Sequence, residues 1–173
     1  MSSENDLINA ELGVTSEPFR ASRVAELKLA SYRMFAQAKK QIDLFSYDLD
    51  PRVLSDRDIE AAISRLVRRS RQSQVRMMVF ETQLLQSADH RLIALMQNLS
   101  SYIHLKVVSK EYQQLPFSFY LVDDSGLIYR PNHQQLESQI YFNEKLKVRD
   151  YRKQFDEIWE QGRIASEFRT LGI

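Results

Sequence analysis

The side chains that could carry out chemistry in this sequence are few. It contains three histidines and no cysteine, which excludes thiolate catalysis, disulfides and sulfur-ligated metals. His133 stands out because Arg130 and Asn132 closely precede it, and imidazole, guanidinium and amide groups together can bind an anion. We expect the acidic turn at Asp123 and Asp124 to lie near them across a hairpin. An exposed loop without a ligand explains the same residues more simply.

The other polar motifs give weaker indications. His90 is expected near the start of a helix and His104 on a strand, and neither has metal-ligand spacing to another ligand. Asp48 and Asp50 could ligate magnesium at a strand end, but the Asp50-Pro51 pair is also typical of a turn. The sequence has no glycine-rich phosphate loop and no zinc pattern, so it predicts no cofactor and no metal.

One group of basic residues favours a nucleic-acid partner. The formal net charge is only +1, so affinity for nucleic acid must come from local clustering. Five arginines lie close together around the end of a predicted helix: Arg65, Arg68, Arg69, Arg71 and Arg76. Arginine pairs well with phosphate, and Arg65, Arg68 and Arg69 are the candidate binding residues. Cations also suit a helix C-terminus, and no aromatic residues interleave with the cluster to stack on bases, so a solvated helix face is the alternative.

Periodic apolar residues predict the elements that position these side chains. Helices are expected from Ser16 to about Lys40, from Ser55 or Asp56 to about Arg71, and from Ser87 to about Leu99. A strand follows each helix, at Gln41–Leu49, Val75–Glu81 and Ile103–Ser109. This alternation is typical of right-handed crossovers that build a parallel sheet with helices on both faces.

The second half of the chain breaks the alternation. Phe117–Val122 and Leu127–Arg130 are predicted strands separated only by the turn Asp123–Gly126, which indicates a hairpin. The segment His133–Asn143 is expected to be irregular, and a final amphipathic helix begins near Glu144. The prediction is therefore an α/β fold with a mixed, largely parallel sheet flanked by helices on both faces.

Length and composition favour one globular domain. At 173 residues the chain can bury one sizeable core, and we expect a lead-in at residues 1–15 followed by a single domain at 16–173. No apolar run approaches the ~20 residues of a membrane helix. The first 13 residues are polar and lack the apolar segment of a secretory signal. A cytoplasmic location is the default expectation.

The order of predicted elements from about Val24 to Arg163 resembles one half-domain of the phospholipase D superfamily. Local similarities lie at residues 38–42, in Tyr47-Asp48-Leu49-Asp50, at residues 129–132 and at residues 155–159. The central similarity is the strand that runs into Asp123. The family's strand reads His-x-Lys-x4-Asp, and the frame that places its aspartate on Asp123 places Pro116 at the histidine and Ser118 at the lysine.

The resemblance implies a mechanism that these substitutions remove. In the family two such motifs meet across a pseudo-two-fold axis, where one histidine attacks phosphorus and the other protonates the leaving group. Proline offers no nucleophile or proton, and serine cannot neutralise a phosphoryl oxygen as lysine does. A symmetric partner would bring only a second Pro116 and Ser118. Phe117, Phe119 and Tyr120 further suggest that apolar side chains fill the former catalytic face.

Three hypotheses for function follow. The leading one is a catalytically inactive phospholipase D-like domain that serves as a binding or assembly module, as a homodimer or with another protein. The second is nucleic-acid binding through Arg65, Arg68 and Arg69. The third is a divergent phosphoesterase, or an enzyme acting on a phosphorylated ligand, that uses Arg130 and His133. A ligand site in this region is predicted to draw on Ser118, Asp123, Arg130, Asn132 and His133.

Overall fold

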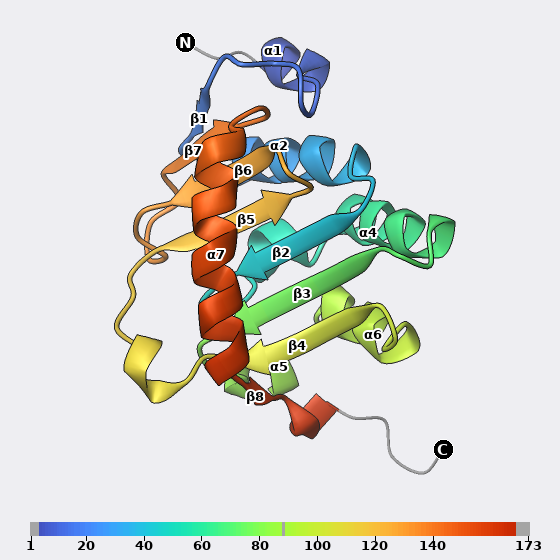
Figure 1. Cartoon of the computed structure of the whole chain (residues 1–173), viewed down its shortest axis with the longest axis vertical. Coiled ribbons are helices and arrows are strands. Elements are labelled where there is room, and N and C mark those ends of the chain that lie inside the picture. The colour runs from blue at the N-terminus through green and yellow to red at the C-terminus, as the bar shows by residue number, and fades with distance from the viewer. Residues whose placement is uncertain (1–3, 88, 169–173) are drawn as a thin grey trace.

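The computed structural model describes residues 4–87 and 89–168, and the strands in this part of the chain form one sheet (Figure 1). The sheet has eight strands in the order β1-β7-β6-β5-β2-β3-β4-β8. Their bounds are β1 Phe19–Ala21, β2 Gln41–Phe45, β3 Gln74–Val79, β4 Ile103–Val107, β5 Ser118–Val122, β6 Gly126–Arg130, β7 Ser138–Tyr141 and β8 Arg163–Ile164.

Helices cover both faces of this sheet, as Figure 1 shows. Their bounds are α1 Glu4–Asn9, α2 Val24–Ala36, α3 Pro51–Leu54, α4 Arg57–Arg69, α5 Gln83–Ser87, α6 Arg91–Asn98 and α7 Lys145–Gln161, with single 3₁₀ turns at Lys110–Tyr112 and Ser166–Phe168. Helices α2, α4 and α6 lie on one face, and α7 crosses the strands on the other. The predicted α/β class with helices on both faces is confirmed.

The prediction of a largely parallel sheet is wrong. Within the described residues only the pairs β2–β3 and β3–β4 are parallel, and the other five pairs are antiparallel. The two parallel pairs are the ones joined by helical crossovers through α4 and α6. After β4 the chain returns to lie antiparallel to β2 as β5, and the hairpins β5–β6 and β6–β7 continue the sheet on that side. The short strands β1 and β8 then pair antiparallel with β7 and β4 at its two edges.

Two predictions of local structure also fail, both for one reason. Phe19, expected in the first turn of a helix, lies instead in β1, and part of the segment expected to be irregular forms β7. Phe19 pairs with Ile140, and both side chains are almost fully buried. Strands of three or four residues give little periodic signal, so this pairing depends on contacts between distant parts of the chain.

The residues of β5 alternate between two apolar cores. Tyr120 and Val122 pack in the core beneath α2 and α4, whereas Phe119 and Leu121 pack against α7. Ser118 shares the α2 face, because it lines the same small space as Leu27 of that helix. Phe119 and Tyr120 therefore fill opposite faces of the sheet.

Candidate functional site

The hairpin of β5 and β6 decides which predicted site residues meet. Ser118 lies directly opposite Arg130, whereas Val122 pairs with Gly126 at the other end. Asp123 follows Val122, so it lies roughly 15 Å along the strand from Ser118, given about 3.3 Å for each residue. The expectation that the acidic turn lies near Arg130 and His133 is therefore wrong. Antiparallel register places it at the opposite edge of the sheet.

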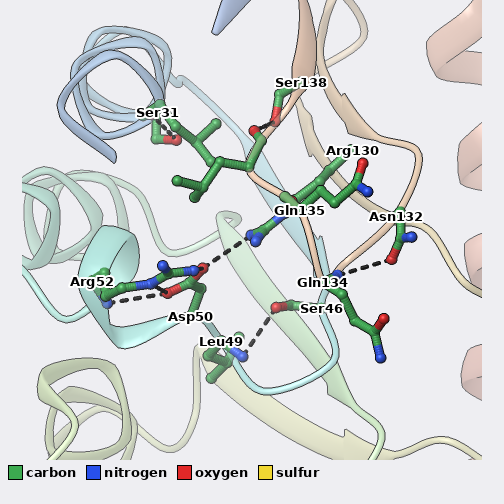
Figure 2. Close-up of polar contacts among 12 residues, drawn as sticks. Ser31, Ser46, Leu49, Asp50, Arg52, Arg130, Asn132, Gln134, Gln135 and Ser138 are labelled. Atoms are coloured by element: carbon green, nitrogen blue, oxygen red, sulfur yellow. Dashed lines mark hydrogen bonds and ion pairs between the residues drawn. The ribbon is translucent and has the colours of Figure 1, made fainter. Parts of the chain in front are cut away.

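Arg130 is buried in an internal ion pair (Figure 2). Its side chain is 7% exposed, and Nη1 donates to Oδ2 of Asp50 over 3.0 Å. Nε donates to the backbone oxygen of Gln135. Asp50 also accepts from Nε and Nη2 of Arg52, at 3.0 and 2.8 Å. Burial raises the pKa of Asp50, but hydrogen bonds from Arg52 and Arg130 outweigh it and hold the pKa below its usual value.

The space beside Ser118 is closed. Ser118 is 3% exposed, and the enclosed space that it lines with Leu27, Tyr120 and Arg130 is too small to admit a water molecule. A phosphate group cannot enter without displacing packed side chains. Of the aromatic residues expected to fill this region, Phe119 and Tyr120 line the space together with Leu27 of α2, whereas Phe117 does not.

His133 lies at the same edge of the sheet but faces a different neighbour. Its ring stacks on Tyr47 with centroids 4.3 Å apart and planes 2° from parallel. Its backbone N donates to the oxygen of Pro116 over 2.8 Å. Burial lowers the pKa of His133, Asp48 opposes this shift and Arg130 adds to it.

The remaining polar groups at this edge shape the loops. Asn132 Oδ1 accepts from the backbone N of Gln134 over 2.9 Å, which fixes the turn before β7 (Figure 2). Burial, followed by the charge of Asp50, raises the pKa of the half-buried Asp48. Residues 4–87 and 89–168 contain no group of three or more His, Asp or Glu side chains placed to hold a metal ion.

Asp123 acts as a clamp on the backbone. Its carboxylate accepts from the backbone N of Lys39 and of Lys40, each over 2.8 Å, and from that of Gln41 over 3.0 Å. Asp123 itself has a φ of 51°, a left-handed conformation that aspartate tolerates better than most residues. The carboxylate thus joins the β5–β6 turn to the loop between α2 and β2.

Replacing Asp123 by alanine is expected to lower the free energy of unfolding by about 2–3 kcal/mol, because three backbone donors lose a charged acceptor. The measurement is urea denaturation followed by circular dichroism. Asp124→Ala, one residue further along the turn and exposed, is the matched control and should change stability by less than about 0.5 kcal/mol. Equal losses in the two variants would contradict the clamp.

Two further histidines have structural or exposed positions. The Nδ1 of His90 accepts from the backbone N of Leu92 at the start of α6, and this leaves Nε2 to donate to the oxygen of Leu49 over 2.8 Å. Burial lowers the pKa of His90. His104 is exposed on β4.

The structure contains a buried charge network that the sequence did not reveal. Asp43 in β2 is 0% exposed, and it accepts from Nε and Nη2 of Arg76 over 2.8 and 3.0 Å and from Nε of Arg152 over 3.0 Å. The Arg76 guanidinium lies 4.7 Å above the ring of Phe155. Arg76 was predicted to belong to the arginine cluster after α4, and it lies instead beneath α7. The signal that could have revealed the network is an aspartate inside an otherwise apolar strand.

The other arginines do gather at the end of α4. Arg65, Arg68 and Arg69 are exposed. Arg69 Nη2 donates to the oxygen of Ala38 over 2.7 Å, so the end of α4 contacts the loop after α2. Arg68 Nε donates to Oγ of Ser64 over 2.9 Å. None of the three contacts the region of Arg130 and His133.

The fold is that of the phospholipase D-like proteins, as its similarity to solved structures shows. Nuc from Salmonella typhimurium, a phospholipase D family member, is 17% identical with a TM-score of 0.59 over 89% of this chain and 100% of its own. NucT from Helicobacter pylori is 12% identical with a TM-score of 0.57 over 86% of this chain and 99% of its own. The archaeal chromatin protein TrmBL2 is 15% identical with a TM-score of 0.64, over 93% of this chain but only 58% of its own.

By sequence, the chain belongs to a family described as a domain of unknown function, DUF7931, whose model matches residues 23–171. No curated protein sequence is significantly similar to it. Among the described residues, no helix combines the length and the apolar character that crossing a bilayer requires.

Proposed function

We propose that this chain is a phospholipase D-like domain that lacks phosphodiesterase chemistry and works as a binding or assembly module. The observation that carries the proposal is the closed space beside Ser118, into which no water molecule fits. When the family motif is aligned on Asp123, Ser118 replaces the motif's lysine and the exposed Pro116 replaces its nucleophilic histidine. Loss of a covalent nucleophile costs on the order of a millionfold in kcat in an enzyme where it has been measured.

The contacts of Arg130 argue against a replacement catalytic site. Its guanidinium is engaged by Asp50 and by Gln135, so binding a phosphate there would break a buried ion pair. Among residues 4–87 and 89–168, no carboxylate is hydrogen-bonded to the His133 ring to activate it as a base; the ring stacks on Tyr47. A homodimer would add only a second copy of the same groups, so it would not supply the missing catalytic residues. Self-association is therefore proposed as a mode of assembly.

A nucleic acid is the class of partner that one comparison favours. TrmBL2, which shares the fold, is an archaeal chromatin protein whose structure shows a novel mode of DNA binding. A binding module on this scaffold is therefore consistent with a polyanionic partner.

The test is hydrolysis of bis(p-nitrophenyl) phosphate by the purified chain. We expect no turnover above that of buffer. Pro116 stands where the family has its nucleophile, and Arg130, the cation opposite Ser118, is held in an ion pair with Asp50 and is not free to bind phosphate. Any turnover is checked with His133→Gln, which changes a half-exposed side chain and should leave the fold intact. Turnover that this variant abolishes would overturn the proposal. Turnover that survives it shows that His133 is not the responsible group, and turnover that co-purifies with the chain in both forms would overturn the proposal as well.

A further inference from the structure

Three segments meet at the edge of the sheet where β2 and β3 begin, opposite the edge that holds Ser118 and Arg130. The end of α4 contacts the loop after α2 through Arg69 and Ala38, and the backbone N of Gln74 donates to the oxygen of Lys40 over 3.1 Å. The β5–β6 turn joins them through Asp123, which binds the backbone of the same loop. The first turn of α7 is adjacent, because the N of Glu144 donates to the oxygen of Ser125 over 2.9 Å.

These segments present a belt of exposed cations. We define the amino-edge belt as Lys39, Lys40, Arg65, Arg68, Arg69, Arg71 and Lys145, all of which are exposed. A hydrogen bond from Ser125, supported by the charges of Lys145 and Lys40, lowers the pKa of Asp124, so both lysines lie near that carboxylate. The carboxylate of Asp123 is already used by three backbone donors. Positive charge therefore dominates this edge.

Helix electrostatics explain only part of the belt. Arg68 and Arg69 lie in the last turn of α4, where the helix dipole favours cations. Helix α7 has the opposite arrangement. Its first turn contains no acidic residue and carries Lys145 and Lys147, and its last turn contains no basic residue. Cations at a helix N-terminus are disfavoured, so the stability of α7 does not account for them.

We infer that the amino-edge belt binds the phosphate backbone of a double-stranded nucleic acid, an inference that rests on the proposed role as a binding module. Arginine and lysine on three adjoining segments supply charge-assisted contacts to phosphates without reading bases. Single strands are bound with the help of stacking aromatic side chains, and the belt has none. The half-buried Tyr129 of β6 packs instead against Tyr151 of α7. Within the described residues the five exposed large apolar side chains are scattered over α1, the loop after it, α5, α7 and β8, so the belt is not joined to a broad apolar face of the kind that enters a membrane surface.

The experiment measures fluorescence anisotropy of a short labelled duplex of mixed sequence between about 50 and about 200 mM salt. The belt variant is Lys40→Ala/Arg71→Ala, and the matched control is Arg57→Ala/Lys110→Ala, which removes one arginine and one lysine at the opposite edge. All four side chains are exposed and none has an ion pair within the described residues. For about five phosphate contacts, the logarithm of the binding constant should fall with a slope of about −4 to −5 against the logarithm of salt concentration.

The belt variant is expected to reduce this slope by about 2, and the control variant to leave it unchanged. Absence of duplex binding at the lowest salt, or equal losses in both variants, would refute the inference. So would tighter binding to single strands, or binding to anionic lipid vesicles in place of the duplex. None of these outcomes would bear on the proposal that the chain does not hydrolyse phosphodiesters. Conversely, if the chain hydrolysed phosphodiesters and still bound the duplex through the belt, only the proposed loss of catalysis would be wrong.

Discussion

Asp43→Ala is expected to lower the free energy of unfolding by about 3–5 kcal/mol, among the largest effects of a single substitution in this chain. Asp43 is fully buried and accepts hydrogen bonds from both Arg76 and Arg152. Its removal leaves two largely buried guanidinium groups facing a cavity, with only the half-exposed carboxylate of Asp156 still paired to Arg76. One of them, Arg152, already has a buried Nη2 without a hydrogen-bond partner. Urea denaturation followed by tryptophan fluorescence provides the measurement, because the single Trp159 lies within reach of Arg76.

The matched control for this prediction is Asp156→Ala. Asp156 pairs with the same Arg76 over 2.8 Å, but its side chain is 54% exposed. Solvent screens such a pair, so its loss should cost no more than about 1 kcal/mol. Burial lowers the pKa of Arg76, but the hydrogen bonds and charge of Asp43, followed by those of Asp156, outweigh it and hold the pKa above its usual value in the natural chain. Arginine is protonated at neutral pH even without such partners, so the guanidinium stays charged in both variants. A loss from Asp156→Ala as large as that from Asp43→Ala would show that burial does not govern this network.

The second large effect is expected from Arg130→Ala, which should lower the free energy of unfolding by about 3–5 kcal/mol. The substitution leaves Asp50 buried with a carboxylate that only Arg52 partly neutralises. It also releases the hydrogen bond from Nε of Arg130 to the loop at Gln135. Thermal and urea denaturation measure the loss. Arg52→Ala removes the other partner of the same carboxylate, and because Arg52 is 57% exposed, it should cost no more than about 1 kcal/mol.

The pH dependence gives an independent check on the Asp50–Arg130 pair. The pKa of Asp50 is held below its usual value, so the pair contributes its full stability above the unfolded carboxyl pKa of 3.8. That contribution is lost as the pH falls through the lower pKa of the folded state. The stability difference between the natural chain and Arg130→Ala should therefore narrow from about pH 6 to about pH 2. A difference that stays constant over this range would mean that Arg130 acts through packing alone.

These predictions concern residues that sequence reasoning placed differently. Arg130 was a candidate ligand of phosphate because it lies two residues from Asn132 and three from His133. Its partner, Asp50, is 80 residues away, and no local pattern connects the two. Asp123 stood in the frame of a catalytic motif, and the structure shows its carboxylate binding three backbone groups 82 to 84 residues away. Arg76 was grouped with its neighbours in the sequence, although the strand turns its side chain toward α7.

The features that the sequence determined by itself are local ones. The apolar period of α4 and the tight turn between β5 and β6 depend on residues only a few positions apart and were predicted, as was a cap of α4 at Ser55 or Asp56, which the structure places at Asp56. The tertiary structure alone decided the pairing of β1 with β7, the closure of the space beside Ser118, and the partners of Asp43 and Arg130. Hydrophobic patterning records whether a residue is buried, whereas the partner of a buried charge depends on which distant segment packs against it. For the same reason, the packing of distant segments decides whether the space beside a motif position is open or filled.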